Sequence, residues 1–390
     1  MNHQYDQLRA DGPILMQRRG QGSVAYVVGY QAAKQILGDH ERFVKDVRNT
    51  VPPAQRSPAE PANDMFSLLY NNMLGTDRPD HTRLRALVSR AFTSRHIQAL
   101  APRIQAIADQ LIAAFATQAE IDLIDAFAFP LPIIVICELL GVPVEDRASF
   151  RRWSHAFIGI ADQAYAYGQS LTEFVQYISR MIAERRANPR NDLISSLVHA
   201  EEQGDRLSEQ ELFSMIALLI VAGHETTVNL IGNGMAALLQ HPDQAALLQR
   251  EPALIDAAIE EFLRYAGPVE MATMRYAAED VQIEGIMIRC GTPVVVVLAA
   301  ANRDPAAFAD AAALDITRDA RKHVGFGYGV HYCLGAPLAR LEAAIAFNTL
   351  LARLPGLQLA VPANQLQYNE GTIVRGLIRL PVRWQAPATR

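Results

Sequence analysis

Near its C-terminal end the chain carries the stretch Phe326-Gly327-Tyr328-Gly329-Val330-His331-Tyr332-Cys333-Leu334-Gly335. Its single cysteine follows a glycine-rich loop and comes just before a long helical pattern over 337–353. A helix N-terminus offers unpaired N–H groups and partial positive charge, which favour an anionic sulfur. The glycines remove side chains where the backbone must approach something large and flat. A lone cysteine is more often a buried structural residue, but this setting favours a thiolate ligand, and haem iron is the metal that such a loop would serve.

The loop resembles the haem-binding signature of the cytochrome P450 family, Phe-x-x-Gly-x-x-x-Cys-x-Gly, with Phe326, Gly329, Cys333 and Gly335 in the expected places. Further family motifs follow in order, so the resemblance covers nearly the whole chain. It implies one catalytic domain over 1–390 with the P450 fold, mainly α-helical with small β-sheets and shaped like a triangular prism. Haem b would lie buried between a long central helix and the helix after the cysteine. Cys333 would be the axial iron ligand, and Phe326, Gly327, His331 and Gly335 would contact the haem.

Length and composition exclude several classes of protein. The 390 residues are 50% hydrophobic and carry a net charge of −5 without a basic stripe, which argues against a nucleic-acid partner. Three widely spaced cysteines form neither a disulfide framework nor a zinc cluster, which fits a reducing cytoplasm. The N-terminus is polar, and the apolar runs 215–223 and 292–301 are shorter than the roughly 20 residues of a membrane span. We therefore expect a cytoplasmic protein without a membrane partner, similar to the soluble bacterial members of the family.

Periodicity predicts a helix-rich body with small sheets. A strand is expected over 24–28 and a helix over 31–37. Four prolines exclude regular structure from 51–62, which in similar proteins is a loop covering the substrate pocket. The remaining expected elements are helices over 95–116, 145–160, 170–186 and 208–240, the last opened by a capping box at Ser208, and strands within 273–297 and 371–384.

The sequence Ala222-Gly223-His224-Glu225-Thr226-Thr227 is expected to interrupt, at Gly223, the long helix that begins at Ser208. A glycine in a helix interior costs about 1 kcal/mol relative to alanine, and a threonine that bonds a backbone carbonyl can open a helix to water. Glu and Thr are also common where a helix merely meets solvent. The stretch resembles the family's oxygen-activation motif. The resemblance implies that Thr226 and Glu225 are catalytic, Glu225 by delivering protons, and that Ala222 contacts the haem.

The two propionates of a buried haem require cations. His81 and Arg85 lie one helical turn apart on one face. The resemblance assigns His81, Arg85, Arg275 and His331 to the propionates.

Glu261 and Arg264 are spaced as an i,i+3 ion pair in an apolar setting. They resemble the family's Glu-x-x-Arg motif, which implies a structural role with Arg318 as the third partner. We expect them to brace the segment that carries the cysteine loop.

The predicted substrate pocket is aliphatic. Its candidate residues are Leu218, Val221, Ala222, Met271, Ile373, Val374, Phe66 and Leu69. None of them is charged, so we expect an apolar substrate of medium to large size. A polyketide, terpenoid, steroid or fatty acid would fit, and the region around the long-helix motif is most similar to bacterial hydroxylases of macrolides and other secondary metabolites.

The resemblance implies a monooxygenase that hydroxylates or epoxidises its substrate with O2. No cysteine cluster or pyrophosphate loop is present, so electrons are expected from a separate ferredoxin or flavodoxin with its NAD(P)H reductase, docked at Arg321, Lys322 and Arg340. One alternative is a peroxygenase, but such enzymes replace the acid–alcohol pair with an Arg-Pro arrangement, and Glu225-Thr226 argues against it. A haem sensor without catalysis is the other alternative.

Overall fold

The computed structural model describes residues 7–20, 22–56, 72–89, 92–146, 149–150, 152–153, 164–202, 205–369 and 373–385. The pocket candidates Phe66 and Leu69 lie outside these residues, as does the end of the predicted helix 145–160.

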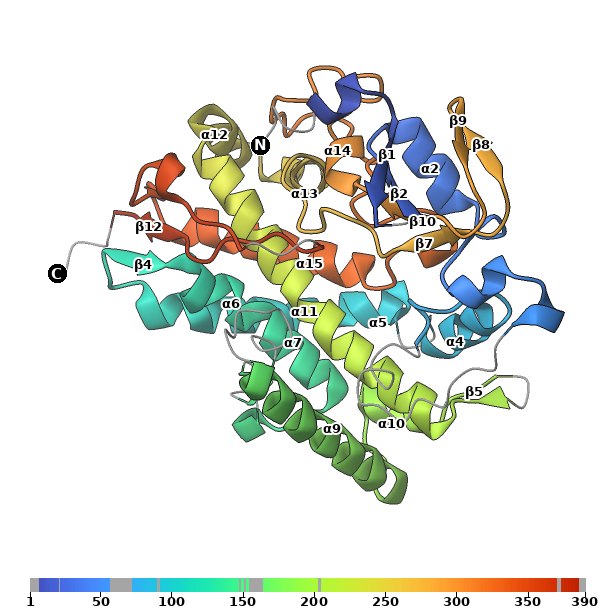
Figure 1. Ribbon diagram of the computed structural model, residues 1–390. Coiled ribbons are helices and arrows are strands. Elements are labelled where there is room, and N and C mark those ends of the chain that lie inside the picture. The colour runs from blue at the N-terminus through green and yellow to red at the C-terminus, as the bar shows by residue number, and fades with distance from the viewer. Residues whose placement is uncertain are drawn as a thin grey trace.

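Helices make up most of the molecule, whose outline in Figure 1 is roughly triangular. They are α2 (Tyr30–Gly38), α4 (Asp80–Ser89), α5 (Ser94–Ala99), α6 (Ala101–Phe115), α7 (Pro130–Leu140), α9 (Ala164–Ala187), α10 (Leu193–Val198), α11 (Glu209–Leu239), α12 (Pro242–Arg250), α13 (Ile255–Tyr265), α14 (Leu298–Ala301) and α15 (Ala336–Arg353). The predicted helix over 95–116 is two helices, since α5 ends before Leu100 and α6 begins after it.

Small sheets lie at the edges of this body. The largest has the strand order β1 (Ile14–Arg19), β2 (Gly22–Val27), β10 (Pro293–Val296), β7 (Arg275–Ala277) and β3 (Phe43–Val44). The others are β11 (Gln358–Leu359) with β12 (Pro381–Arg383) and β4 (Glu120–Asp122), β5 (Glu201–Glu202) with β6 (Asp205–Arg206), and β8 (Val281–Ile283) with β9 (Ile286–Ile288). Helices with small sheets are the predicted fold class.

Helix α11 is the centre of the fold and crosses α15 in Figure 1. Ser208 and Glu211 form the predicted capping box at its start. The helix is continuous through Gly223, so the interruption that we expected at this glycine is wrong. Gly234 allows the close crossing, because a Cβ there would lie 2.7 Å from the Phe347 ring of α15. By length and hydropathy α11 could span a membrane, but 67% of its most apolar window is buried inside the protein, as in a core helix.

The predicted Glu261–Arg264 pair is fully buried and braces the chain before the cysteine loop. Arg264 Nε lies 2.7 Å from Glu261 Oε2, and Arg318 Nε lies 3.3 Å from Glu261 Oε1, which confirms the third partner. Arg264 also donates to the backbone carbonyls of Ala311 and Ala313, each at 2.8 Å. These bonds attach the irregular segment that leads to the loop to helix α13.

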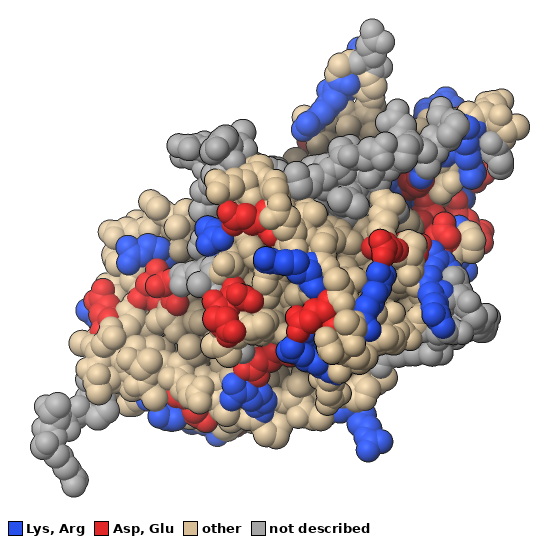
Figure 2. All heavy atoms as spheres, turned by 90° about the horizontal axis from the view of Figure 1, so that it is seen from below, with Lys and Arg blue, Asp and Glu red and all other residues tan. Residues whose placement is uncertain are grey.

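Charges on the outer helices are mixed. Figure 2 shows basic and acidic side chains interspersed over one face. Ion pairs on the outer helices include Arg103–Glu138 and Arg152–Glu173, both at 2.7 Å. This face has no single-sign field of the kind that binds nucleic acid.

Candidate active site

The cysteine loop folds tightly before α15. Cys333 N donates to Phe326 O at 2.9 Å, and Gly327 N donates to Val324 O at 2.8 Å. Gly327 and Gly329 both have φ of 75°, the left-handed region that favours glycine. A Cβ on Gly329 would also lie 2.6 Å from the Leu37 carbonyl of α2. At these two positions the structure explains the glycines of the motif.

Backbone N–H groups at the start of α15 hold the Cys333 sulfur. Its side chain borders accessible space, yet the surrounding protein is dense, so burial raises the pKa of the thiol above its ordinary value. Hydrogen bonds from the N–H groups of Gly335 and Ala336, and the charge of Arg85, lower the pKa only in part. Coordination to a metal would favour the thiolate further and complete its deprotonation.

The four predicted propionate ligands come together from three segments. The rings of His81, on α4, and His331, in the turn Gly329–His331, lie 4.3 Å apart between centroids. Arg85 Nη2 donates to Tyr332 O at 2.7 Å, which ties α4 to the cysteine loop. Arg275, on β7, is only 4% exposed.

Positive charge exceeds negative charge in this cluster of predicted propionate ligands. Burial, reinforced by His81, Arg275, Lys45 and Arg85, lowers the pKa of His331 to about 2. Burial lowers the pKa of Arg275 to about 10 although Asp77 opposes the shift. Within the described residues neither ring nitrogen of buried His81 has a hydrogen-bond partner. Buried like charges of this kind are costly unless anions pair with them, so the residues present fit a group that carries two carboxylates beside a sulfur-bound metal.

Lys45 and Asp77 belong to the cluster, and the sequence did not reveal them. Lys45 Nζ donates to Thr273 Oγ1 and to Met274 O, both at 2.7 Å, and burial with the nearby Arg275 lowers its pKa to about 7. Asp77 accepts from the backbone N–H of Lys45 at 2.8 Å. Strand β3 pairs with β7, which sets the residue after Val44 opposite Arg275. No local pattern could have indicated this, because the pairing joins segments far apart in the chain.

The motif on α11 lies along one stripe of the helix. Most of α11 is buried, but the positions Leu218, Val221, Ala222, Glu225 and Thr226 are less buried and recur at i, i+3, i+4, i+7 and i+8. Thr226 Oγ1 donates to Ala222 O at 3.0 Å, the predicted hydroxyl-to-carbonyl bond. Glu225 Oε1 accepts from Asn229 Nδ2 at 2.9 Å, and burial raises the pKa of the Glu225 carboxyl.

The other pocket candidates lie on neighbouring extended segments. Met271 pairs with Val297, and Val374 pairs with Val269, through isolated antiparallel bridges. Ile373 is 47% exposed. Their role as a substrate wall stays a prediction.

Arg340 is not a free docking charge. Its Nε lies 2.6 Å from Glu260 Oε1, and its guanidinium lies 4.6 Å from the Phe326 ring centroid. Burial would raise the pKa of Glu260, but hydrogen bonds from Arg340 and His323 outweigh it and lower that pKa to about 2. Arg340 therefore supports the cysteine loop, and its expected contact with a redox partner stays a prediction. Arg321 pairs with Asp319 at 2.7 Å, and both side chains remain exposed.

A buried carboxyl on α15 also escaped the sequence analysis. Glu342 is 1% exposed, and burial raises its pKa to about 8. Its Oε2 has no hydrogen-bond partner in the described part of the chain. The one signal was a glutamate within an apolar helical pattern.

Comparisons with known proteins agree on one family. The profile described as Cytochrome P450 matches residues 160–355. The curated "Cytochrome P450 monooxygenase PikC" of Streptomyces venezuelae is 48% identical over 385 residues, covering 98% of this chain and 90% of the relative. The solved structure of the bacillaene polyketide synthase cytochrome P450 PksS of Bacillus subtilis has a TM-score of 0.90 and 41% identity, covering 98% of this chain and 96% of that one. Myxobacterial cytochrome P450 CYP267B1, solved with myristic acid, has a TM-score of 0.88 and 43% identity over 98% of this chain and 96% of that one.

Proposed function

Because the chain belongs to the cytochrome P450 family and is a monooxygenase of the oxidoreductase class, we propose that it hydroxylates or epoxidises a polyketide or macrolide. The whole chain, 1–390, is then one catalytic domain. The main observation behind this proposal is that Cys333, at the start of α15, lies close to the buried cation cluster, which α4, β7 and the cysteine loop form.

The chain's own residues would hold haem b in this way. Cys333 supplies the sulfur ligand, and the N–H groups of Gly335 and Ala336 orient that sulfur. His81, Arg85, Arg275 and His331 bind the propionates, with Lys45 beside them. Phe326, Gly327 and Ala222 would contact the haem. When bound, haem supplies the reductive activation of O2, and the protein supplies its surroundings.

Glu225 and Thr226 would handle the protons of the reaction. Burial raises the pKa of the Glu225 carboxyl, which makes it a better proton carrier than an exposed carboxylate. The Thr226 hydroxyl, on the same stripe, donates to a carbonyl and also retains acceptor capacity for a second partner. This acid–alcohol pair favours a reaction with O2 over a peroxygenase reaction. A haem sensor without catalysis would not need such a pair.

The aliphatic stripe of α11 supports an apolar substrate. Leu218, Val221 and Ala222 present only hydrocarbon beside the acid–alcohol pair, and Met271, Ile373 and Val374 would complete the wall. The relative named for a polyketide synthase favours a polyketide or macrolide. The relative solved with myristic acid supports a fatty acid as the second candidate.

Electrons would come from a ferredoxin or flavodoxin and its NAD(P)H reductase in the cytoplasm. Exposed Tyr328 and Tyr332 and the exposed Lys322 lie on or near the cysteine loop. Because Arg340 is paired with Glu260, Lys322 is a better candidate than Arg340 for a charged contact with the electron donor.

The test begins with the carbon monoxide adduct of the reduced holoprotein, which should show a thiolate-type absorption band, absent in Cys333→His. Macrolides, linear polyketides, steroids and fatty acids are then screened for substrate-induced spectral shifts. Compounds that bind are incubated with a surrogate ferredoxin system and O2. Hydroxylated macrolide or polyketide products support the proposal. Turnover of fatty acids alone moves it to the second candidate, and product from peroxide but not from the ferredoxin system contradicts the monooxygenase route.

A further inference from the structure

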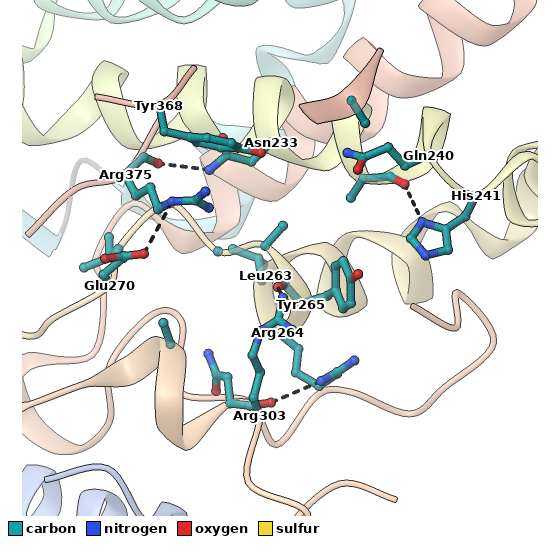
Figure 3. Close-up of a pocket in the computed structure, with 17 residues that line it drawn as sticks. Asn233, Gln240, His241, Leu263, Arg264, Tyr265, Glu270, Arg303, Tyr368 and Arg375 are labelled. Atoms are coloured by element: carbon teal, nitrogen blue, oxygen red, sulfur yellow. Dashed lines mark hydrogen bonds and ion pairs between the residues drawn. The ribbon is translucent and has the colours of Figure 1, made fainter. Parts of the chain in front are cut away.

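Two buried asparagines of helix α11 contact the C-terminal segment, residues 373–377. Asn233 is 2% exposed, and its Nδ2 donates to Arg375 O at 2.9 Å (Figure 3). Asn229, one helical turn earlier, is 3% exposed and packs against Gly376. The C-terminal segment is therefore attached to α11 at two successive turns of the helix.

The contact between Asn229 and Gly376 leaves no room for a side chain on the C-terminal segment. A Cβ on Gly376 would lie 1.8 Å from Asn229 Oδ1 and 2.4 Å from Asn229 Cγ, far inside van der Waals contact. The φ of Gly376 is outside the left-handed region, so the backbone conformation does not require glycine there. Glycine at this position therefore serves the close approach of the segment to α11.

The Asn229 side chain is also held at its other end. Its Nδ2 donates to Glu225 Oε1 at 2.9 Å. Rotating the amide away from Gly376 would break this hydrogen bond in the protein interior, where unpaired polar groups are costly. Asn229 is therefore a fixed spacer between α11 and the C-terminal segment.

Hydrogen bonds on both edges stiffen the C-terminal segment. Glu270 N donates to Ile373 O at 2.9 Å on one edge. Asn369 N donates to Gly376 O at 2.9 Å on the other edge. Because these bonds hold the backbone extended, a shift at Gly376 would also move Ile373 and Val374, the predicted pocket residues just before it.

Packing around Arg375 is incomplete. Together with Asn233 and Tyr368, Arg375 lines a cavity of about 240 Å³, and Figure 3 shows these three side chains around it. The guanidinium lies 3.5 Å from the centre of the Tyr368 ring, and its Nε lies 3.6 Å from Glu270 Oε1. The C-terminal segment can therefore shift on this side without compressing a dense core, and the contact with Asn229 limits how closely it approaches α11.

We propose that Asn229 is a positioning residue for the substrate pocket and sets the distance between α11 and the pair Ile373 and Val374. A larger distance would widen the space between the aliphatic stripe of α11 and the C-terminal segment, and a smaller distance would narrow it. The contact of Asn229 with Gly376 thus determines the size of substrate that the enzyme accepts. This role rests on the proposed function in one respect, since it takes Ile373 and Val374 as pocket residues.

Three iron ligands of increasing size test this role in the holoprotein: imidazole, 4-phenylimidazole and 1-tritylimidazole. Difference spectra give each dissociation constant, and imidazole corrects for access to the iron. Gly376→Ala should push the segment outward and raise the affinity for the larger ligands, relative to imidazole, about tenfold. Asn229→Ala should let the segment settle closer to α11 and lower this relative affinity. The control Gly22→Ala, where a Cβ meets nothing closer than 3.9 Å, should leave it unchanged.

A change of opposite sign in the two variants is the result that a merely structural role would not produce. If the relative affinity for the larger ligands stays at the wild-type value in both variants, the proposal is wrong.

Melting temperatures test the contact itself without any assumption about the reaction. Gly376→Ala should lower the melting temperature, because its methyl group overlaps Asn229. In the wild-type background Asn229→Ala should also lower it, by removing the hydrogen bond to Glu225. In the Gly376→Ala background the same change should instead raise it, because it makes room for the methyl group. A decrease of equal size in both backgrounds would show that the two residues do not compete for space.

The double variant also covers the case in which Gly376→Ala alone does not fold. The double variant should then fold, and Asn229→Ala should still lower the relative affinity for the larger ligands. A double variant that does not fold, or an unchanged affinity in Asn229→Ala, contradicts the proposal. If the wild-type protein forms no oxygenated product while these results hold, the proposed function fails and the positioning role of Asn229 stands.

Discussion

At the scale of single residues, the acid–alcohol pair separates an oxygen-activating enzyme from a haem protein that only binds ligands. Thr226 contributes one hydroxyl, which already donates to the Ala222 carbonyl at 3.0 Å. The stripe around it is otherwise aliphatic or acidic.

Thr226→Ala should retain substrate binding and lower product formation by about tenfold or more, since positioned proton transfer contributes 10²–10⁴-fold in general. The measurement is product formed per NAD(P)H consumed, alongside the substrate-induced spectral shift. Thr226→Ser retains the hydroxyl and should recover most of the product yield. Equal yields from the wild type and Thr226→Ala would remove Thr226 from the mechanism.

Glu342 makes stability depend on pH. Burial raises its pKa to about 8 in the folded chain, so between its ordinary pKa of about 4.3 and that value the folded state binds more protons than the unfolded state. The free energy of unfolding therefore falls as pH rises through this window. Glu342→Gln cannot ionise and should lose this slope, so that the variant gains roughly 3–4 kcal/mol in free energy of unfolding relative to the wild type between pH 5 and pH 8. Urea unfolding at the two pH values checks this, and parallel curves for the wild type and the variant would show that Glu342 ionises in the folded protein at its ordinary pKa.

At the scale of elements, α13 holds the approach to the cysteine loop through the buried Glu261–Arg264–Arg318 group. Both side chains of the central pair have no exposed surface. Removing one partner leaves a buried charge unpaired, which typically costs 3–5 kcal/mol.

Arg264→Ala should therefore destabilise the protein by about 3–5 kcal/mol and weaken haem retention by loosening the segment before the loop. Chemical unfolding of the purified protein measures the first effect. Arg186→Ala is the control, because its pair with Glu209 is exposed and such pairs contribute at most about 1 kcal/mol. Similar losses of unfolding free energy in the two variants would mean that the burial of the Glu261–Arg264 pair does not increase its contribution to stability.

At the scale of the whole molecule, the cation cluster joins α4, β7, the chain after β3 and the cysteine loop. Lys45 is its least expected member, and burial beside Arg275 lowers its pKa to about 7. Its positive charge is unfavourable until carboxylates arrive.

Lys45→Met should therefore act in opposite directions on two states. The haem-free protein should be more stable than the wild type at pH 6, where Lys45 carries its charge, by about 1 kcal/mol. The loaded protein should release haem faster, about tenfold, when an excess of a competing apoprotein takes it up. Unfolding of apoprotein and the rate of haem transfer measure the two effects. A variant that destabilises both states equally would reduce Lys45 to a packing residue.

Residue types and spacing alone determined the family resemblance, the cysteine proposed as the ligand, the mainly helical class and the Glu261–Arg264 brace, because each is a local pattern whose chemistry constrains neighbours within a few residues. The α11 motif was equally visible, although its helix proved continuous. Only the tertiary structure decided which distant groups share one dielectric environment. It placed Lys45 beside Arg275 through the β3–β7 pairing, paired Arg340 with Glu260 and buried Glu342. These features depend on burial and on contacts between distant segments. A short stretch of residues indicates neither the burial nor the contacts.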